Sequence, residues 1–597
     1  MHRRLKRAVT NAALRPGRVL RETFAAGYGL RDLRADLGAG AVVGVVALPL
    51  SMALAIASGV PPQHGLDTAI VAGLVAALLG GSRVQVTGPT AAFVVVLAPI
   101  AARYGLGGLM LATLLAGFIL IAMGIARLGR MIEFVPYPVT AGFTAGIAVV
   151  IGTLQLRDFL GLRVAAMPEH YLERIAVLAR ALPTLRWPDL AAGAATMTVL
   201  LAWPRVTRKV PAPLLALVVV SVGCWAAARL FPAFQVETIL SRFPAATAGA
   251  VGGIPRLPPL PAWPWSFPGA DGAPFHLKWD IVRTLAGPAF AIAVLGAIES
   301  LLSATVADGM TGDKHDSDAE LIGQGLANLT APFFGGIAAT GAIARTATNV
   351  RFGARSPLAA AFHALFVLAA VLLLAPLLGH LPMAALAATL LVVAWNMGEF
   401  RHVAHVLRVA PRGDVFVLVT CFALTVLFDM VIAVSVGVVL AAFLFMDRMA
   451  ESSRTDLLSE AHPEFVHGLP RNLVVYEVAG PLFFGAASKA MSTLRTLRKN
   501  VKVVVFDLRA VPVIDATGLV NLESAIARLH GAGIFVLLGG LNRQPMEVIR
   551  DAGWREEPGR LALRASLAEA VEEGRRRIQE IQGPPPAGGA AAAAVSG

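Results

Sequence analysis

Long apolar segments, closed by charged residues or by Pro and Gly clusters, follow one another from residue 37 to residue 446. A helix needs about 20 largely apolar residues to cross about 30 Å of hydrocarbon. On this criterion the pattern predicts fourteen transmembrane segments, several of which are too short to span a membrane alone. They are 37–60, 66–82, 84–102, 104–126, 134–156, 190–203, 210–228, 281–307, 321–334, 340–350, 357–378, 381–397, 415–428 and 430–446.

The pattern changes after Arg448. Short β-rich segments at 473–478, 502–506 and 534–538 alternate with helical patterns at 486–497, 517–530 and 544–551. Such alternation predicts a small α/β domain. The predicted divisions are a basic N-terminal tail (1–34), a membrane transport domain (35–448), a linker (449–468), the α/β domain (469–580) and a disordered Pro-, Gly- and Ala-rich tail (581–597).

The composition excludes an ordinary soluble enzyme. Hydrophobic residues make up 56% of the 597 residues and charged residues only 15%, whereas soluble domains carry about 25% charged residues. The excess of 51 Lys and Arg over 38 Asp and Glu is typical of basic cytoplasmic loops, so no nucleic-acid partner is expected. Two cysteines, Cys224 and Cys421, cannot form a disulfide framework or a metal cluster. We therefore expect no metal and no cofactor.

Basic residues set the expected orientation in a lipid bilayer. Nine Lys or Arg precede residue 35, without the apolar core or the cleavage site of a signal peptide. This places the N-terminus in the cytoplasm. Five of the loops then expected inside are basic, whereas the loop at 308–320 holds five acids and one Lys. Both termini and the α/β domain are predicted on the cytoplasmic side.

Two interrupted segments in corresponding positions of the two seven-span halves share a local pattern. Residues 80–90 and 335–345 each contain Gly-Gly, a short extended stretch, Thr-Gly and a helix start. Paired interruptions of this kind point to a transporter site near the bilayer midplane. Two helix N-termini, with Arg345 one turn along the second helix, favour an anionic substrate. The alternative is that the glycines only permit close helix packing and that Arg345 snorkels to the cytoplasmic face.

Glu299 lies within an apolar stretch, after fifteen uncharged residues and before eight more. A carboxylate at that depth is costly and usually functional. Glu299 is therefore the candidate for proton coupling, binding a proton from the outside and releasing it inside. The alternative is a permanent ion pair with Arg345 that holds the helices together. His363 has apolar neighbours and is expected to be a packed core histidine, and Asp429 is expected in a loop.

Several ordered motifs resemble the SulP anion transporters, the sulfate permease family. They are PPQHGL at 61–66, TGP at 87–89, AIESLLS at 297–303, DGMTG at 308–312, PFFGG at 332–336 and ART at 344–346. The stretches VVVFDL at 503–508 and IDATGL at 514–519 resemble a STAS domain, the module that follows the membrane part in this family. Within the family, WNM at 395–397, LTVLFDM at 424–430 and PLFF at 481–484 are similar to the bacterial C4-dicarboxylate transporters of the DauA type.

The resemblance implies a seven-plus-seven inverted repeat, an elevator-type alternating-access mechanism and a homodimer in the bacterial inner membrane. It also implies a substrate site, with Glu299 beside it. Carried over by position, the site residues are Leu50, Ser51, Thr90, Ala91, Ala344 and Arg345. The Thr-Gly pairs of the two interrupted segments add Thr87, Gly88, Thr340 and Gly341 to the predicted site. Relatives often have Ser where this chain has Ala344, and some have Gln where it has Leu50. Ala516 replaces the Ser of STAS domains that act as phosphorylated switches, so regulation of that kind is not expected.

Three functional hypotheses follow. The first is import of a C4-dicarboxylate (succinate, fumarate or aspartate) coupled to protons. The second is transport of an inorganic anion, either sulfate with protons or bicarbonate with sodium. The third is a membrane sensor or anchor that transports nothing and whose STAS domain recruits a cytoplasmic protein partner. An enzyme is not expected, because no nucleophile, base and orienting group occur together at useful spacing.

Overall fold

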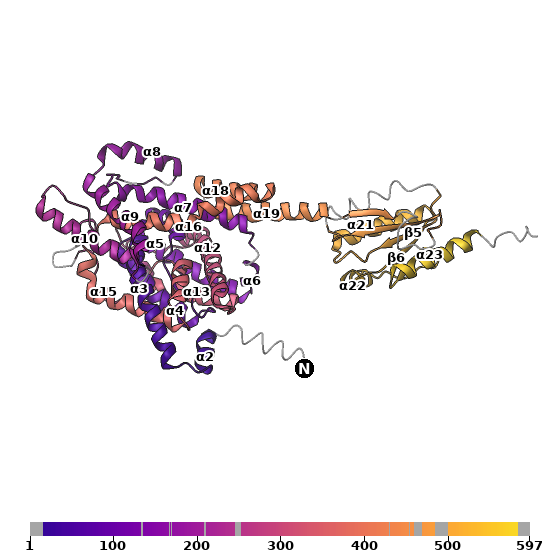
Figure 1. Cartoon of the computed structure of the whole chain (residues 1–597), viewed down its shortest axis with the longest axis horizontal. Coiled ribbons are helices and arrows are strands. Elements are labelled where there is room, and N and C mark those ends of the chain that lie inside the picture. Colours follow the sequence, from indigo (N-terminus) through magenta and orange to yellow (C-terminus); the bar gives the residue numbers. More distant parts are fainter. Residues whose placement is uncertain are drawn as a thin grey trace, which may run out of the picture. The chain divides into compact units, whose positions relative to one another are not determined.

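The computed structural model describes residues 16–132, 135–165, 167–168, 170–207, 210–244, 252–428, 430–452, 454–458, 468–483 and 500–582. The chain divides into two compact units, Met1–Val439 and Leu440–Gly597 (Figure 1). Four features expected from the sequence lie outside the described residues. They are the first fifteen residues of the basic tail, Asp429, the helix at 486–497 and the tail from residue 583.

The first unit is helical. Its first half contains α2 (Arg18–Ala25), α3 (Leu30–Ala57), α4 (Pro62–Leu79), α5 (Ala91–Ile125), α6 (Gly129–Ile132), α7 (Tyr137–Phe159), α8 (Tyr171–Ala181), α9 (Trp187–Val206) and α10 (Ala212–Leu230). Its second half contains α11 (Ile239–Arg242), α12 (Trp279–Thr311), α13 (Ser317–Thr330), α14 (Ile343–Arg351), α15 (Leu358–Leu378), α16 (Met383–Gly398), α17 (Phe400–Val409) and α18 (Arg412–Leu427). The last membrane helix, α19 (Met430–Ser452), continues into the second unit. Short 3-10 turns lie at Leu182–Thr184, Pro264–Ser266 and Ala331–Phe334.

The described part of the chain contains nine helical segments that are long and apolar enough to cross a membrane. The predicted spans that are absent from this set correspond to helices that are shorter or less apolar, namely α9, α13, α14 and α18. The spans predicted at 84–102 and 104–126 correspond to one helix, α5, which bends at Gly105, where φ is +71°. The predicted start at residue 84 was wrong, because residues 84–90 are not helical and contain the extended pair Thr87–Gly88. A Cβ at Gly105 would lie 2.1 Å from the carbonyl carbon of Gly269, so only glycine fits this bend. The helix count is consistent with about fourteen spans.

Helices from the two halves of the chain pack against one another. Helix α13 packs on α5, and α15 packs on α3, whereas α7 packs with α16 and α18. Glycines allow this close approach. A Cβ at Gly117 of α5 would lie 2.8 Å from the carbonyl oxygen of Gly325 in α13, and the reverse distance is also 2.8 Å. In lipid, small residues let helix backbones approach and gain van der Waals contact. His363 of α15 is fully buried in this packing, as expected.

The second unit is an α/β domain built on a five-stranded sheet. Its elements are β3 (Arg454–Leu458), β4 (Leu473–Ala479), β5 (Val503–Asp507), α21 (Ala516–Gly531), β6 (Phe535–Gly539), α22 (Arg543–Asp551), β7 (Leu561–Arg564) and α23 (Leu567–Gln582). The strand order is β3-β4-β5-β6-β7, and only the β3–β4 pair is antiparallel. Along β5, Val504 and Phe506 belong to one core, and Val503 and Val505 belong to the other. Alternate residues of a strand face opposite sides, so the sheet is buried on both faces.

Candidate functional site

Two short extended segments meet inside the membrane unit. β1 (Thr87–Gly88) pairs antiparallel with β2 (Thr340–Gly341), with Thr87 opposite Gly341 and Gly88 opposite Thr340. All four residues are buried. The two Thr-Gly pairs of the interrupted segments therefore lie side by side, although more than 250 residues separate them. Extended backbone inside a membrane protein needs such internal hydrogen bonding.

A helix begins directly after each of these segments. Thr90 precedes the first residue of α5, and Ala342 precedes the first residue of α14; neither position caps its helix through its side chain. The first backbone N–H groups of a helix have no partner within it and lie at the positive end of the helix dipole. At the start of α14, Ile343 and Ala344 are exposed rather than packed. This pair of helix starts is therefore suited to an anion.

Arg345 lies across the junction between the halves. Its side chain is buried, with 2% of the residue exposed, and its Nη2 donates a hydrogen bond to the backbone carbonyl of Pro89. Its Nη1 lies 2.7 Å from the position that a Cβ at Gly88 would occupy. Nε and Nη1 make no hydrogen bond with any described residue. The alternative that Arg345 snorkels to the cytoplasmic face is therefore wrong, because the guanidinium points into the protein.

Glu299 of α12 faces the start of α5. Its Oε2 accepts a hydrogen bond of 2.8 Å from the hydroxyl of Thr90. Within the described part of the chain, no ion pair joins Glu299 to Arg345. The structure therefore does not contain the permanent ion pair between Glu299 and Arg345 that the alternative predicted. The two charged groups interact electrostatically across the site, but their side chains do not approach to ion-pair distance.

The predicted site residues of the first span, Leu50 and Ser51, lie on α3, beside the helices of this site. Helix α3 contacts both α5 and α14. On α3, Leu50 is half-buried, and Ser51 is fully buried with a hydroxyl that has no hydrogen-bond partner among the described residues. Ala91, the first residue of α5, is 7% exposed. The structure thus places Leu50 and Ser51 on α3, and Ala91 and Ala344 on two helices that each contact α3.

Thr87 and Thr340 have their hydroxyl groups engaged within the protein. The Thr87 hydroxyl accepts a 2.7 Å hydrogen bond from Nε2 of Gln324. The Thr340 hydroxyl donates to the carbonyl of Gly296 at 2.9 Å and lies 2.7 Å from the hydroxyl of Ser300. These two threonines therefore hold the crossing segments in place, and their hydroxyls do not face the exposed start of α14.

One polar face of α13 supports both crossing segments. Glu320 accepts hydrogen bonds from the backbone N–H groups of Gly81 and Ser82 at 2.8 and 3.1 Å. It also accepts one from the Gln85 side chain at 2.9 Å. Four and eight residues further along α13, Gln324 binds Thr87, and Asn328 both donates to and accepts from the backbone of Ala339 at 2.8 Å. This polar face is absent from the predicted site; polar residues at intervals of four within an apolar helix are the signal that could have revealed it.

A second set of polar contacts fixes α14 against the first half. The Thr346 hydroxyl accepts hydrogen bonds from the backbone N–H of Val86 and from the hydroxyl of Ser303, both at 3.0 Å. Asn349 donates to the carbonyl of Val84 at 2.8 Å. These residues were also missed, because nothing in the local sequence shows which segment a buried Ser or Thr will contact.

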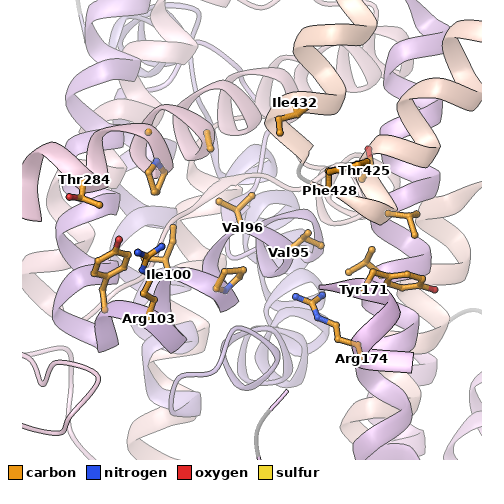
Figure 2. A pocket seen from close by; sticks show the side chains of 17 residues that line it. Val95, Val96, Ile100, Arg103, Tyr171, Arg174, Thr284, Thr425, Phe428 and Ile432 are labelled. Atoms are coloured by element: carbon orange, nitrogen blue, oxygen red, sulfur yellow. The ribbon is translucent and has the colours of Figure 1, made fainter. Parts of the chain in front are cut away.

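A cavity of about 550 Å³ lies beyond the start of α5 (Figure 2). Val95, Val96 and Ile100 of α5 and Ala291 of α12 line it, but none of the predicted site residues does. Ala291 precedes Glu299 by eight residues, which is about 12 Å along a helix. The same two helices, α5 and α12, therefore line this cavity and carry Thr90 and Glu299.

The fold, the paired helix starts and the buried guanidinium define a helical membrane transporter for anions. The chain matches the sequence profile of the sulfate permease family over residues 33–421 and that of the STAS domain over residues 466–570. The protein belongs to the sulfate permease family, whose members are transporters rather than enzymes.

Individual relatives agree with this assignment. The chain is 42% identical over 531 residues to YvdB of Bacillus subtilis (strain 168), provisionally named a sulfate transporter, covering 88% of this chain and 95% of YvdB. It is 29% identical over 517 residues to the bicarbonate transporter BicA of Picosynechococcus sp. (strain ATCC 27264 / PCC 7002 / PR-6), covering 83% and 86% of the two chains. The solved structure of SLC26A9 shares the fold, with a TM-score of 0.80 at 17% identity, over 98% of this chain and 96% of that one.

These comparisons confirm the helical membrane fold with a C-terminal STAS domain that the sequence predicted. They show the family and a multi-pass membrane protein. The relatives named above are sulfate and bicarbonate transporters by name, whereas residues 395–397 and 424–430 suggest the C4-dicarboxylate transporters.

Proposed function

We propose that the protein is a secondary active transporter that carries a small divalent oxyanion, with sulfate as the first candidate. The observation that carries this proposal is the buried Arg345 guanidinium. It has no ion-pair partner among the described residues and lies beside two helix starts without side-chain caps. Positive charge inside a low-dielectric region is costly unless it is compensated. Glu299 compensates this charge in part, through an electrostatic interaction beyond ion-pair distance, and a bound anion would add to that compensation.

The identity of the anion is supported by the relatives. YvdB, at 42% identity, is named for sulfate. BicA, at 29% identity, is named for bicarbonate, which keeps bicarbonate with sodium as a related possibility. The apolar side chains of Leu50 and Ala344 offer no hydrogen bonds to a substrate, so backbone N–H groups and Arg345 would carry most of the recognition.

A C4-dicarboxylate such as succinate, fumarate or aspartate is the second candidate. The motifs at 395–397 and 424–430 favour it, because they resemble those of dicarboxylate transporters. Two separate helix starts also suit a substrate with two separate carboxylates.

We further propose that Glu299 couples transport to protons. It accepts a hydrogen bond from Thr90 at the start of α5 and interacts electrostatically with Arg345 without an ion-pair contact between described residues. Protonation of Glu299 would therefore change the net charge beside the substrate. An elevator-type movement would carry this site across the membrane, in a homodimer in the bacterial inner membrane with both termini in the cytoplasm. The domain limits at 35–448 and 469–580, and a cytoplasmic protein partner for the STAS domain, stay predictions.

The decisive experiment compares anions in proteoliposomes that contain only this protein. Uptake of labelled sulfate, succinate and bicarbonate is measured separately, with an inward proton gradient, with an inward sodium gradient and with neither. We expect saturable sulfate uptake that the proton gradient stimulates. Succinate uptake that excess sulfate does not inhibit would instead establish the dicarboxylate function. Sodium-dependent bicarbonate uptake would identify bicarbonate as the substrate and sodium as the coupling ion. The absence of any saturable flux would show that the protein does not transport these anions.

A further inference from the structure

Helix α17 is a short amphipathic helix with one basic face. Arg401, His405 and Arg408 follow one another at i, i+4 and i+7, and all three are exposed. Side chains at this spacing lie on one face of a helix. The helix contains no Asp or Glu, and neither arginine forms an ion pair or a side-chain hydrogen bond with a described residue. The basic face therefore carries two positive charges that the described protein does not neutralise.

The opposite face of α17 is apolar. Phe400, Val403 and Leu407 lie at i, i+3 and i+7. Phe400 and Val403 are half-buried, whereas Leu407 is 41% exposed, and Val409 at the end of the helix is 65% exposed. The described protein thus leaves part of the apolar side uncovered. Helices with one apolar face and one Arg-rich face lie in the interface of a lipid bilayer, with the apolar face toward the acyl chains.

The helix begins where a membrane helix ends. Helix α16 ends at Gly398, and Glu399 adopts a left-handed backbone conformation with φ of +42°. This conformation interrupts the helix, so α17 does not continue along the axis of α16. The apolar span predicted at 381–397 ends at the same point. Helix α17 therefore starts at the edge of the apolar layer.

Two exposed aromatic side chains mark the same edge. The ring of Trp395 lies 5.3 Å from the ring of Phe400, and the ring of Tyr137 lies 5.7 Å from the ring of His402. Trp395 is 62% exposed, and Tyr137 is 48% exposed. Exposed Trp and Tyr side chains concentrate where the hydrocarbon meets the lipid headgroups. Their contacts with the first residues of α17 place this helix at headgroup level.

We propose that α17 binds the headgroups of anionic phospholipids. The recognised group is a phosphate diester in a lipid of net negative charge, such as phosphatidylglycerol. Arg401 and Arg408 contact the phosphates, and Arg412, which is exposed at the start of α18 and has no ion pair with a described residue, adds a third positive charge. The apolar face of α17 inserts between the upper parts of the acyl chains. Basic residues are attracted to an anionic membrane surface, and the buried apolar area adds to the affinity.

Bound lipid would act on a defined group of helices. Helix α17 connects α16 to α18, and both of these helices pack against α7. None of the predicted substrate-site residues lies on α7, α16 or α18. The lipid therefore holds this group of helices at the membrane surface without touching the site beside Arg345. The proposal does not depend on which anion the protein transports.

The test measures which lipid lies next to α17 in the full-length protein. Val409→Cys provides an exposed thiol for a bimane fluorophore, and the parent is the labelling control because its Cys224 and Cys421 are buried. The labelled protein is placed in phosphatidylcholine nanodiscs. A small, equal fraction of either phosphatidylglycerol or phosphatidylcholine carries a nitroxide on the acyl chain, which quenches bimane at short range. We expect stronger quenching by phosphatidylglycerol at low ionic strength, with an enrichment of roughly fivefold for each arginine.

Matched variants assign the enrichment to the basic face. Arg401→Gln combined with Arg408→Gln should lower the enrichment until the two lipids quench equally. Lys at both positions keeps the charge and should keep the enrichment. Arg543→Gln combined with Arg550→Gln removes two arginines at the same spacing of seven residues from α22, in the second unit, and should also keep it. Each variant must elute from size-exclusion chromatography like the parent, which shows that it is folded.

Four results would overturn the proposal. The first is equal quenching by the two lipids in the labelled parent. The second is an unchanged enrichment in the double Gln variant of α17. The third is an equal loss in the double Gln variant of α22, which means that net charge and not α17 attracts the lipid. The fourth is loss of the enrichment with inorganic phosphate but not with sodium chloride of equal ionic strength, which means a site for free phosphate.

Discussion

The guanidinium of Arg345 on α14 donates a hydrogen bond to the backbone carbonyl of Pro89, which lies just before α5 in the other half of the chain. A charge from the second half is thus fixed against the start of a helix from the first half. Because Arg345 is buried and points across the β1–β2 pair, its charge acts on both helix starts. This relationship is the basis of the proposed anion site.

Replacing Arg345 with Ala should weaken anion binding by at least about tenfold, because a hydrogen bond to a charged group contributes about 1.5–3 kcal/mol. Binding of labelled sulfate to the detergent-purified protein is the measurement. Arg351→Ala, at the exposed other end of the same helix, is the matched control and should bind normally. Parental affinity in Arg345→Ala would mean that the guanidinium has only a structural role.

Replacing Glu299 with Gln should mimic the protonated carboxyl group. Exchange of labelled for unlabelled substrate should survive, and proton-driven accumulation should be lost, because no charge remains to be titrated. Asp280→Asn, an exposed carboxylate on the same helix, is the control and should accumulate substrate normally. Proton-driven accumulation at the parental level in Glu299→Gln would show that another group couples transport to protons.

Thr90→Val offers a milder test of the same arrangement. It removes the 2.8 Å hydrogen bond to Glu299 and leaves the carboxyl group in place. We expect transport to persist with its pH profile displaced, because the hydroxyl donates to the carboxylate form. The pH dependence of uptake, measured beside the parent, decides this, and an identical profile would argue against titration of Glu299 during transport.

Gly88→Ala should abolish transport without removing any polar group. Its Cβ would lie 2.7 Å from Nη1 of Arg345, too close for the guanidinium to keep its position. Gly309→Ala is a suitable control, since a Cβ there meets nothing within 4 Å. Uptake and sulfate binding are both measured, and normal binding in Gly88→Ala would mean that the position of Arg345 is not critical.

Glu320→Ala should lower the thermal stability of the membrane unit strongly. It leaves the donors of Gly81, Ser82 and Gln85 without their acceptor, and each buried unpaired donor costs about 1–3 kcal/mol. Asp313→Ala removes only a 3.6 Å ion pair with Arg83 between two exposed side chains, which is worth about 0–1 kcal/mol. Unfolding temperatures in detergent compare the two variants, and equal values would refute the anchoring role of Glu320.

The lengths and apolarity of the membrane helices are local properties, so the sequence alone predicts them. It also predicts the α/β character of the second unit and the two interrupted segments, because chain composition and spacing carry this information. The sequence also predicts a break near residue 103, and the structure bends two residues later, at Gly105. Strands β3 and β7 were not predicted, since pairing with the neighbouring strands, and not a strong local pattern, defines them.

Tertiary structure alone decided where the buried polar groups point. The sequence identified Arg345 and Glu299 but left open whether they pair with each other, and the structure instead gives them Pro89 and Thr90 as partners. It also turned Thr87 toward Gln324. A buried hydrogen-bonding group is costly without a partner, and the partners of Glu299, Thr87 and Arg345 each lie more than 200 residues away along the chain. The periodicity of apolar residues along the chain predicts which helices are buried and how long they are. Which distant residue a buried polar group bonds to is determined only when the two halves of the chain pack together.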